Sequence, residues 1–357
     1  MKVLIMHAGQ DAQDYYRVRE PVREIEAAGL GIEIETTRGI ATTVTRPTDG
    51  SQPEVYEVDA RGADVVVLQL PKTQAMLETI RVLQADGVAV VVEMDDLLSA
   101  VPFGQLGHDA LVRKGMARKA AECARAADLV TTTTPALLKE YAPHGRGVAI
   151  PNAIPRRIAE LPPAYERPSG VVTVGWTGSV YGHPYDLQEL GSGLQQALDA
   201  TSRSSRFAVI GQVGDARQRL RLSEEPVEVA WVKGVDAYTT TIGETFDIGI
   251  APLRIDRFNT CKSWLKVLEY ASRGVAFVHS PTAEYERFGL GWRARSAKDW
   301  SKALTTLISD EDRRAEQAVA ARETVLARHL TEHTAEHWVG AWRQALDHRA
   351  SSRRKYA

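Results

Sequence analysis

Apolar, β-branched runs alternate with amphipathic stretches twice along this chain, once on each side of a proline cluster. In the first half the runs are residues 2–7, 31–36, 64–70, 88–94, 129–133 and 147–150. In the second half they are residues 171–176, 207–211, 227–231, 246–251 and 275–279. Continuous runs of this kind, separated by helices, are typical of parallel sheets covered on both faces. The pattern therefore predicts an α/β fold.

Prolines separate the two halves, at Pro151, Pro155, Pro162, Pro163 and Pro168. Because proline interrupts both helices and central strands, we expect an inter-domain linker here. A chain of 357 residues also exceeds the size of one ordinary core. We predict an N-terminal domain over 1–152, a linker over 153–170, a C-terminal domain over 171–330, and a C-terminal helix and tail over 331–357.

Two doubly wound domains joined by a short linker predict a cleft onto which the carboxyl ends of both sets of strands face. Ligands of such sheets bind outside the carboxyl ends of the strands. Function is therefore expected in the loops that follow strands. Near the end of the chain, Trp338 and Trp342 lie four residues apart in a helical pattern, so they share one face and predict a helix packed back onto the core.

Composition excludes several classes of protein. The net charge of −2 gives no general attraction to nucleic acid or to an anionic membrane. No segment approaches the roughly 20 apolar residues that a membrane span requires, and the N-terminal apolar run is too short for a signal sequence. Cys123 and Cys261 form neither a disulfide framework nor a metal-binding spacing. We therefore expect a cytoplasmic protein with no metal site.

Residues 246–270 read as a buried strand, a polar loop containing Asn259, and an amphipathic helix that starts near Lys262. Lys262 and Ser263 at a helix entrance, beside free backbone N–H groups, suit a diphosphate. Glu269, two turns into the helix, suits a pair of sugar hydroxyls. The segment therefore predicts a nucleotide-sugar site.

Lys266 adds to this segment, because on a continuous helix it would share a face with Lys262. The alternative is a solvated face with an ion pair between Lys266 and Glu269, which contributes only a few tenths of a kcal/mol. The position after a buried strand favours function.

A turn of small residues, with Gly178 and Ser179, follows the first strand of the second half. Gly178 allows a backbone to approach a ligand, and Ser179 offers a hydroxyl and an N–H group. The alternative is an ordinary turn with Asp186 as a helix N-cap. No G-x-G-x-x-G fingerprint opens either half, which weakens a nicotinamide or flavin interpretation.

In the first half, Asp95 and Asp96 follow an apolar strand, and one of them is a candidate general base for an acceptor hydroxyl. Adjacent carboxylates point apart, so they make a poor acid–base pair for glycoside hydrolysis. Capping of a turn is the alternative. Arg17 lies near a helix start, where the dipole favours anions, so it is a candidate for holding an anionic part of donor or acceptor. A solvated first turn is the alternative.

A basic stretch contains Arg113, Lys114 and Arg118. Such a run is usually a solvated helix face. It also matches a footprint for a nucleic-acid phosphate backbone.

Together these segments resemble GT-B-fold glycosyltransferases, particularly the glycosyltransferase family 4-like branch. The resemblance is carried by YYRVREP (15–21), VEMDDLL (92–98), ADLVTTTTPALLKEY (127–141), VAIPNAIP (148–155), VGWTGSVYGHPYDL (174–187) and the segments FDIGIAPL (246–253) and FNTCKSWLKVLEYASRGVAFVHS (258–280). VEMDDLL, and GWTGS followed by His183 and Asp186, look like a sub-branch common among bacterial surface-polysaccharide and phage-encoded transferases.

The resemblance implies a role for each matching position. Glu269 matches a glutamate that binds the donor ribose. The donor diphosphate is held near Lys262 and Ser263, with Gly178 and Ser179 opposite, and the loop Trp231–Gly234 frames the nucleobase. The implied donor-binding set is Gly178, Ser179, Trp231, Lys233, Asn259, Lys262, Ser263, Lys266 and Glu269. Cys261 departs from the pattern, because the family's motif places there a glutamate that contacts the donor sugar.

The implied activity is transfer of a sugar from a UDP- or GDP-linked donor to a hydroxyl, with the donor in the C-terminal domain and the acceptor in the N-terminal domain. Lys262 would stabilise the leaving diphosphate without a required metal. Arg17 and His183 are the acceptor-binding candidates. In an inverting reaction Asp95 or Asp96 would be the base, and in a retaining one the leaving phosphate would take the proton.

The acceptor and some alternatives stay open at this stage. A glycan is the default acceptor. A phage-type enzyme, located in the host cytoplasm, would instead modify 5-hydroxymethylcytosine or a related base in DNA, with Arg113, Lys114 and Arg118 along the nucleic acid. A nucleotide-sugar epimerase and a non-catalytic nucleotide-sugar-binding protein are the other classes. The oligomeric state is not predicted.

Overall fold

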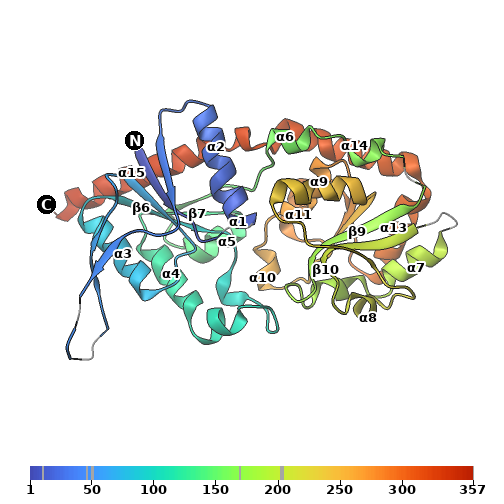
Figure 1. Ribbon diagram of the computed structural model, residues 1–357, viewed down its shortest axis with the longest axis horizontal. Helices are drawn as coiled ribbons and strands as arrows, with labels where there is room; N and C mark the ends of the chain where they lie inside the picture. Colours follow the sequence, from blue (N-terminus) through green and yellow to red (C-terminus); the bar gives the residue numbers. More distant parts are fainter. Residues whose placement is uncertain (10–11, 46, 50–51, 169, 202–204, 357) are drawn as a thin grey trace. The chain divides into compact units, whose positions relative to one another are not determined.

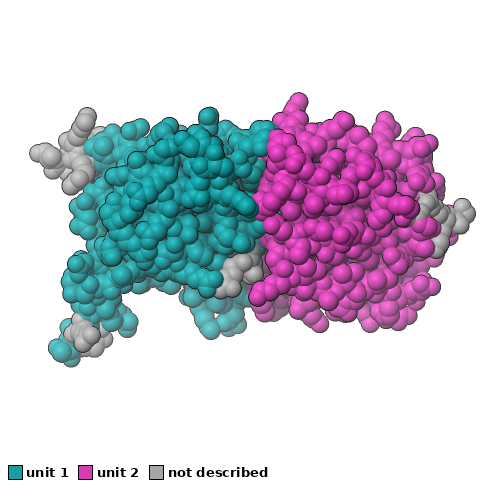
Figure 2. All heavy atoms as spheres, turned by 45° about the horizontal axis from the view of Figure 1, so that its top comes forward, with its two compact units in different colours: residues 1–101, 107–152, 331–357 teal, residues 102–106, 153–330 magenta. Residues whose placement is uncertain are grey.

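The computed structural model describes residues 1–9, 12–45, 47–49, 52–168, 170–201 and 205–356 (Figure 1). It consists of two compact units, coloured separately in Figure 2. The N-terminal unit contains residues 1–101, 107–152 and 331–357, and the C-terminal unit contains residues 102–106 and 153–330. The C-terminal helix is thus part of the N-terminal unit.

A six-stranded parallel sheet in the order β2-β1-β5-β6-β7-β8 forms the centre of the N-terminal unit. Its strands are β1 (Lys2–Met6), β2 (Glu33–Thr37), β5 (Val65–Gln69), β6 (Ala89–Met94), β7 (Leu129–Thr132) and β8 (Gly147–Ala149). The sequence pattern did not predict a separate antiparallel pair, β3 (Thr42–Val44) with β4 (Val55–Val58). The residues of β3 are all exposed, so this strand lacks the alternation of apolar and polar residues by which a strand is predicted.

The helices of this unit are α1 (Ala12–Asp14), a π-helix (Tyr15–Arg19), α2 (Glu20–Ala27), α3 (Gln74–Ala85), a 3-10 turn (Leu98–Ala100), a second π-helix (Asp109–Arg113), α4 (Met116–Ala126), α5 (Pro135–Tyr141), another 3-10 turn (Thr331–His333) and α15 (Ala335–Tyr356). The basic stretch that contains Arg113, Lys114 and Arg118 does not lie on one continuous helix. Gly115, in the left-handed region at φ +81°, separates the second π-helix from α4.

The C-terminal unit has its own six-stranded parallel sheet, in the order β11-β10-β9-β12-β13-β14. Its strands are β9 (Val172–Ser179), β10 (Ser205–Gln212), β11 (Val227–Val229), β12 (Ile248–Ala251), β13 (Ala276–His279) and β14 (Trp292–Arg293). Its helices are α6 (Arg156–Ala159), 3-10 turns (Ala164–Glu166 and Asp186–Leu190), α7 (Gly193–Ala200), α8 (Ala216–Leu220), α9 (Val235–Thr245), α10 (Arg257–Thr260), α11 (Leu265–Ser272), α12 (Ala283–Phe288), α13 (Ala297–Ser309) and α14 (Glu311–Arg328). The predicted α/β class with two doubly wound sheets is confirmed.

Each sheet has its own hydrophobic core. The core of the N-terminal sheet includes Trp338 and Trp342 of α15, which are 3% and 2% exposed, so the predicted packing of the C-terminal helix onto a core is confirmed. Both cysteines, Cys123 and Cys261, are free and buried. Among the helices of the described residues, none is long and apolar enough to cross a membrane.

A buried ion pair connects the first helical segment to the centre of the N-terminal sheet. Arg17 Nε lies 2.6 Å from Glu93 Oε1, and both side chains are at most 2% exposed. The guanidinium also donates to the carbonyl oxygen of Ile150 at 2.6 Å and to Asn152 Oδ1 at 3.2 Å. Its carbon lies 4.6 Å from the ring centre of Trp338. Arg17 therefore joins β6, the end of β8 and α15.

Removing one member of this pair leaves the other charge buried. We expect Arg17→Met to lower the free energy of unfolding of the N-terminal unit by about 3–5 kcal/mol. The measurement is urea unfolding followed by circular dichroism. Arg113→Met is the control: Arg113 is 73% exposed beside Asp109, and its loss should cost at most about 1 kcal/mol. Equal effects of the two substitutions would contradict a structural role for Arg17.

Candidate functional site

The candidate site of the C-terminal unit begins where its central strands end. β9 runs beside β10, with Gly178 opposite Gly211 and Ser179 opposite Gln212. β12 borders β9 on its other side. Because these strands are parallel, the loops that follow β9, β10 and β12 emerge at the same edge of the sheet.

The turn at the end of β9 requires glycine. Gly178 has φ +139°, and a Cβ there would lie 3.1 Å from the ring of Trp176. The next residue, Ser179, donates its hydroxyl hydrogen to Gln212 Oε1. Gly178 and Ser179 are therefore the last two residues of β9, and not a turn after the strand as their small size was expected to indicate; the hydrogen bond to Gln212 fixes Ser179 against β10.

The loop after β12 contains a short helix, α10, that the sequence pattern did not predict. Asp256 caps this helix by accepting a hydrogen bond from the Asn259 backbone at 2.8 Å. The helix expected from Lys262 therefore begins only at Leu265, and Lys262 and Ser263 lie in the turn before it. The prediction that Lys262 and Lys266 share one face of a continuous helix is wrong. Both turn residues are half-buried.

Asp186 holds this loop in place. Its carboxylate is 5% exposed and accepts hydrogen bonds from Arg254 N at 3.0 Å, from Asn259 Nδ2 at 2.8 Å and from His183 Nδ1 at 2.7 Å. Burial raises the pKa of this carboxyl, but the hydrogen bonds from His183 and from the Arg254 backbone outweigh it, and the pKa is lowered overall. Asp186 is therefore an anchor between two loops and not the helix N-cap considered above.

His183 and Asn259 both form hydrogen bonds with Asp186. Burial lowers the pKa of His183, so the neutral imidazole is favoured, with Nδ1 donating to Asp186. Asn259 is 2% exposed and also donates to the carbonyl oxygen of Arg254 at 3.0 Å. Both residues therefore shape the loops of the site from within. These hydrogen bonds fit residues that position the loops better than residues that contact a ligand directly, which is the role expected of them.

Lys266 reaches from α11 to the glycine turn. Its ammonium donates to the carbonyl oxygen of Thr177 at 2.6 Å and to the Thr177 hydroxyl at 3.0 Å, and it lies 5.5 Å from the ring centre of Trp176. Burial lowers the pKa of Lys266 to about 8. The surface ion-pair alternative does not describe this lysine, because its hydrogen bonds go to the end of β9.

Glu269 lies one turn further along α11 and is 5% exposed. The hydroxyl of Tyr238, on α9, donates to Glu269 Oε2 at 3.4 Å. The ring of Tyr238 stacks in turn on Trp231, with centroids 6.3 Å apart and planes inclined by 26°. Trp231 is 63% exposed and presents an indole face to solvent, and Lys233 beside it is also exposed.

Lys262 completes the site from the turn before α11. Its ammonium lies 4.5 Å from the ring centre of Phe258, a buried residue of α10. The aromatic ring and the anchored loop limit where this cation can point. The site thus combines an exposed aromatic face, a buried carboxylate, two lysines and a glycine turn.

The N-terminal unit places Asp95 and Asp96 directly after β6, at the carboxyl edge of its sheet. The carbonyl oxygen of Asp95 accepts a hydrogen bond from Thr133, and that of Asp96 accepts one from Tyr141 at 3.1 Å. Both aspartates are half-buried. These hydrogen bonds fix the backbone of both aspartates at the sheet edge where the acceptor was expected to bind.

Arg17 does not fit the acceptor-binding role expected of it. Its guanidinium is 2% exposed and is engaged by Glu93, Ile150 and Asn152. An arginine at a helix start needs an anionic partner, as the sequence indicated. That partner is a buried glutamate and not a ligand.

The basic residues considered for nucleic acid are each near an acid. Arg113 and Lys114 lie 2.9 and 3.2 Å from Asp109, and Arg118 lies 2.8 Å from Glu122. All three are more than 70% exposed. The local charge is thus largely balanced, which favours the solvated-face alternative.

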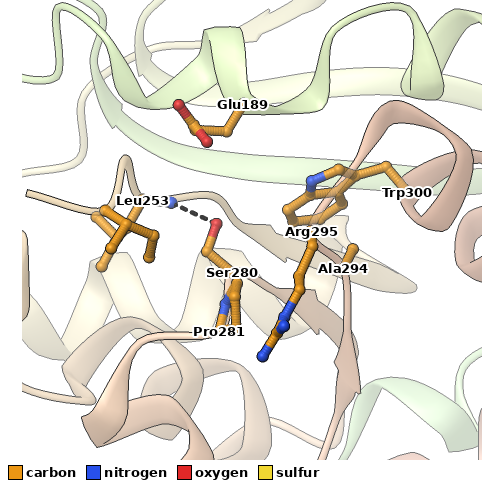
Figure 3. A pocket seen from close by; sticks show the side chains of 8 residues that line it. Glu189, Leu253, Ser280, Pro281, Ala294, Arg295 and Trp300 are labelled. Atoms are coloured by element: carbon orange, nitrogen blue, oxygen red, sulfur yellow. Dashed lines mark hydrogen bonds between the residues drawn. The ribbon is translucent and has the colours of Figure 1, made fainter.

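A separate cavity of about 340 Å³ lies at the ends of β12, β13 and β14 (Figure 3). It is lined by Glu189, Leu253, Ile255, Ser280, Pro281, Ala294, Arg295 and Trp300. The Leu253 backbone donates to Ser280 Oγ at 2.9 Å, and both residues line the cavity. None of the predicted site residues lines it. In the part of the chain that the structure describes, no group of three or more His, Cys, Asp or Glu side chains is placed to hold a metal.

Residues 194–340 match the family model described as "Glycosyl transferase-like". The matched region contains Trp231, Lys262 and Glu269. Among curated protein sequences, none is significantly similar to this chain.

Solved structures show the same fold. The Anabaena protein Alr3699/HepE, in complex with UDP and glucose, has a TM-score of 0.63 and 13% identity, over 95% of this chain and 98% of that one. The UDP-forming α,α-trehalose-phosphate synthase from Burkholderia vietnamiensis has a TM-score of 0.58 and 12% identity, over 97% of both chains. TarM has a TM-score of 0.57 and 13% identity over 78% of this chain, and the chain spans about half of its length (54%). The fold is thus that of GT-B glycosyltransferases.

The Asp186 anchor should be measurable as stability and as order in the loop after β12. Asp186→Ala leaves three donors without their acceptor, so we expect unfolding of the C-terminal unit to require at least about 2 kcal/mol less. Because the folded pKa of this carboxyl is lowered, its contribution is present above its unfolded pKa and is lost as the pH falls through the folded value.

Hydrogen exchange provides the local measurement for this variant. The backbone amides of Arg254 and Asn259 should exchange faster in Asp186→Ala than in the wild type. Glu225→Ala removes a 67% exposed carboxylate beside Arg217 and is the control. It should change neither the free energy of unfolding nor the exchange rates of these two amides. Unchanged exchange at both amides in Asp186→Ala would show that the loop is ordered by other contacts.

Proposed function

We propose that this protein is a glycosyltransferase that moves a sugar from a UDP-linked donor to a hydroxyl of an acceptor, an activity of the EC 2.4 type. The C-terminal unit would bind the donor and the N-terminal unit the acceptor. The matched glycosyltransferase-like region, the GT-B fold and the geometry of the C-terminal site support this proposal.

One observation carries it: a ring stacking, a hydrogen bond and one turn of α11 connect the exposed indole, the buried carboxylate and the lysine that reaches the end of β9. Trp231 stacks on Tyr238, Tyr238 donates to Glu269, and Lys266, one turn before Glu269, donates to Thr177 beside Gly178. The exposed indole suits a nucleobase, the carboxylate suits ribose hydroxyls, and the lysines and glycine turn suit a diphosphate. The order of these groups is the order of base, ribose and diphosphate in a nucleoside diphosphate.

The chemical task of such a site is to stabilise the diphosphate as it leaves the sugar. Lys262 supplies a positive charge at the entrance of α11, and the backbone N–H groups near it and near Gly178 supply further donors. Lys266 is held by Thr177, so it contributes charge from a fixed position. We propose that these groups act without a required metal.

Sugar identity is expected to depend on the loop after β12. Cys261 is buried at the position where the resembling family has a glutamate that contacts the donor sugar. The protein would therefore contact the sugar through other groups of this loop. We place it in the family 4-like branch, with bacterial surface-polysaccharide and phage-encoded relatives, on the order and spacing of its motifs.

For the acceptor, we propose a glycan hydroxyl. DNA containing 5-hydroxymethylcytosine is the second candidate, and the exposed Arg113, Lys114 and Arg118 are the only residues singled out for it. Their pairing with Asp109 and Glu122 makes it the weaker of the two. Charge reversal of the three would abolish modification of such DNA, with donor hydrolysis unchanged, if DNA is the acceptor.

Donor binding is the first test. We expect Glu269→Ala and Lys262→Ala each to weaken UDP-glucose binding by about tenfold or more, because each removes a charge-assisted hydrogen bond worth about 1.5–3 kcal/mol. Isothermal titration calorimetry measures this directly. Lys298→Ala, which removes an exposed lysine of α13, is the matched control. Wild-type affinity in both site variants would refute the site assignment.

The pH dependence of binding tests the role of Lys266. Its pKa of about 8 means that the ammonium loses its proton as the pH rises through 8, so UDP affinity should fall between pH 7 and pH 9.5. We expect a fall of about fivefold, since one charge near the protein surface changes binding by about 1 kcal/mol. In Lys266→Met the affinity should be lower at pH 7 and nearly independent of pH across this range. An identical pH profile in the variant would assign the effect to another group.

Product analysis separates the reaction classes. Mass spectrometry of mixtures with UDP- and GDP-sugars should show sugar added to an acceptor, and only slow hydrolysis without one. An epimerase would convert the donor with no acceptor present, and a binding protein would leave it unchanged.

A further inference from the structure

The cavity of about 340 Å³ in the C-terminal unit has no role in the site proposed for the donor (Figure 3). Its walls come from loops at the carboxyl edge of one sheet. Leu253 follows β12, Ser280 directly follows β13, and Ala294 directly follows β14. Glu189, in the 3-10 turn Asp186–Leu190, and Trp300, on α13, supply the remaining walls.

Hydrogen bonds between these loops hold the cavity open. The backbone N–H of Ser280 donates to the carbonyl oxygen of Ala251 at 3.1 Å, and its hydroxyl oxygen accepts from Leu253 N at 2.9 Å. The next residue, Arg254, donates its backbone N–H to the Asp186 carboxylate at 3.0 Å. Because the fold itself forms the cavity, a ligand would require little ordering of the protein.

Three polar side chains of the cavity have no partner among the described residues. Glu189 is half-buried, and no described residue donates a hydrogen bond to its carboxylate. Trp300 is 1% exposed, and no described residue accepts a hydrogen bond from its indole N–H. Arg295 is exposed, and no described acid pairs with its guanidinium. Figure 3 shows the three on different walls. One acceptor and two donors are thus available to a ligand.

The charges around the cavity are of both signs, which decides the kind of ligand. Burial, together with the charges of Asp186 and Asp256, raises the pKa of Glu189, while the charge of Arg254 opposes this effect. A simple anion would be repelled by the carboxylates, and a simple cation by Arg254 and Arg295. A neutral molecule whose groups both donate and accept hydrogen bonds matches such a cavity, and a sugar hydroxyl is such a group.

The size and the apolar walls fit a single sugar ring. A volume of about 340 Å³ equals that of about 11 water molecules in the liquid, at about 30 Å³ each. A hexose, with twelve non-hydrogen atoms, is of this size. Leu253, Ile255, Pro281 and Ala294 supply apolar surface for the C–H groups of the ring.

We infer that this cavity binds one monosaccharide unit, whose hydroxyls donate to Glu189 and accept from the indole N–H of Trp300 and from Arg295. The inference goes beyond the proposed function, because the cavity shares no lining residue with the predicted donor-binding set. Ile255, on the cavity wall, is 58% exposed, so the cavity is accessible from solvent. A free sugar and the terminal unit of a glycan have this same chemistry.

The test uses the full chain labelled with 5-fluorotryptophan and observed by ¹⁹F NMR. Trp300→Phe identifies the signal of the tryptophan in the cavity. Glucose, galactose, mannose and N-acetylglucosamine are each titrated to about 50 mM, because a lone sugar ring is expected to bind with a Kd in the millimolar range. Circular dichroism checks that each variant is folded.

We expect at least one of the four sugars to shift the Trp300 signal saturably. Glu189→Ala should weaken this binding by about tenfold or more, because it removes a hydrogen bond to a charged group. Arg295→Met should weaken it by about threefold, because the guanidinium is exposed to solvent. The matched controls are Glu228→Ala, at an exposed position of β11, and Arg313→Met, at a 56% exposed position of α14. Neither control should change the affinity.

A second titration separates the cavity from the donor site and identifies the source of the sugar. Saturating UDP should leave the sugar-dependent shift of Trp300 unchanged. A methyl glycoside that binds as tightly as the free sugar would identify the ligand as the end of a glycan. Binding of the free sugar alone would identify a free monosaccharide.

Three results would overturn the inference. They are a Trp300 signal that none of the four sugars shifts, a shift that UDP abolishes, and sugar binding that Glu189→Ala and Arg295→Met leave intact. A shift produced by leucine or glycine in place of the sugars would assign the cavity to a dipolar ion, with the same consequence. None of these measurements involves a nucleotide sugar, so a protein that does not bind UDP-sugars would refute the proposed function alone.

Discussion

Asp186 accepts hydrogen bonds from a backbone amide and two side chains that belong to different loops, and the geometry of the candidate donor site depends on this convergence. It ties the segment after β9 to the segment after β12. The turn before α11, which contains Lys262, is thereby held in place. Lys266, on α11, can then reach Thr177. A buried carboxylate is tolerated here only because its acceptor positions are filled, so the same contacts that stabilise the charge also order the site.

The two sheets, and the loops in which the candidate site lies, could be predicted from the sequence because both depend on local patterns. Buried parallel strands require continuous apolar runs, and the carboxyl ends of these runs predict where the loops of a ligand site begin. Contacts between distant residues could not be predicted in this way. Asp186 meets Arg254 and Asn259 across 68 and 73 residues, and nothing in the local sequence distinguishes it from a helix cap. The start of α11 was misplaced for a local reason, since Asp256 caps the start of a separate short helix, α10, which ends at Thr260 before α11 begins.

In the N-terminal unit, too, the distant partner of a charged residue could not be predicted from the sequence. Arg17 looked like a ligand-binding residue because its positive charge was unexplained, and the explanation lies in Glu93, inside an apolar run read only as a strand. A glutamate within such a run was the available signal that a buried partner existed.

The position of a bound donor tests the central claim most directly. In a crystal structure of the protein with UDP, we predict the uracil against Trp231, the ribose hydroxyls at Glu269, and the diphosphate beside Lys262, Ser263 and Gly178. Density for the nucleotide in the cavity between Glu189 and Arg295, or in the N-terminal unit, would contradict the assignment.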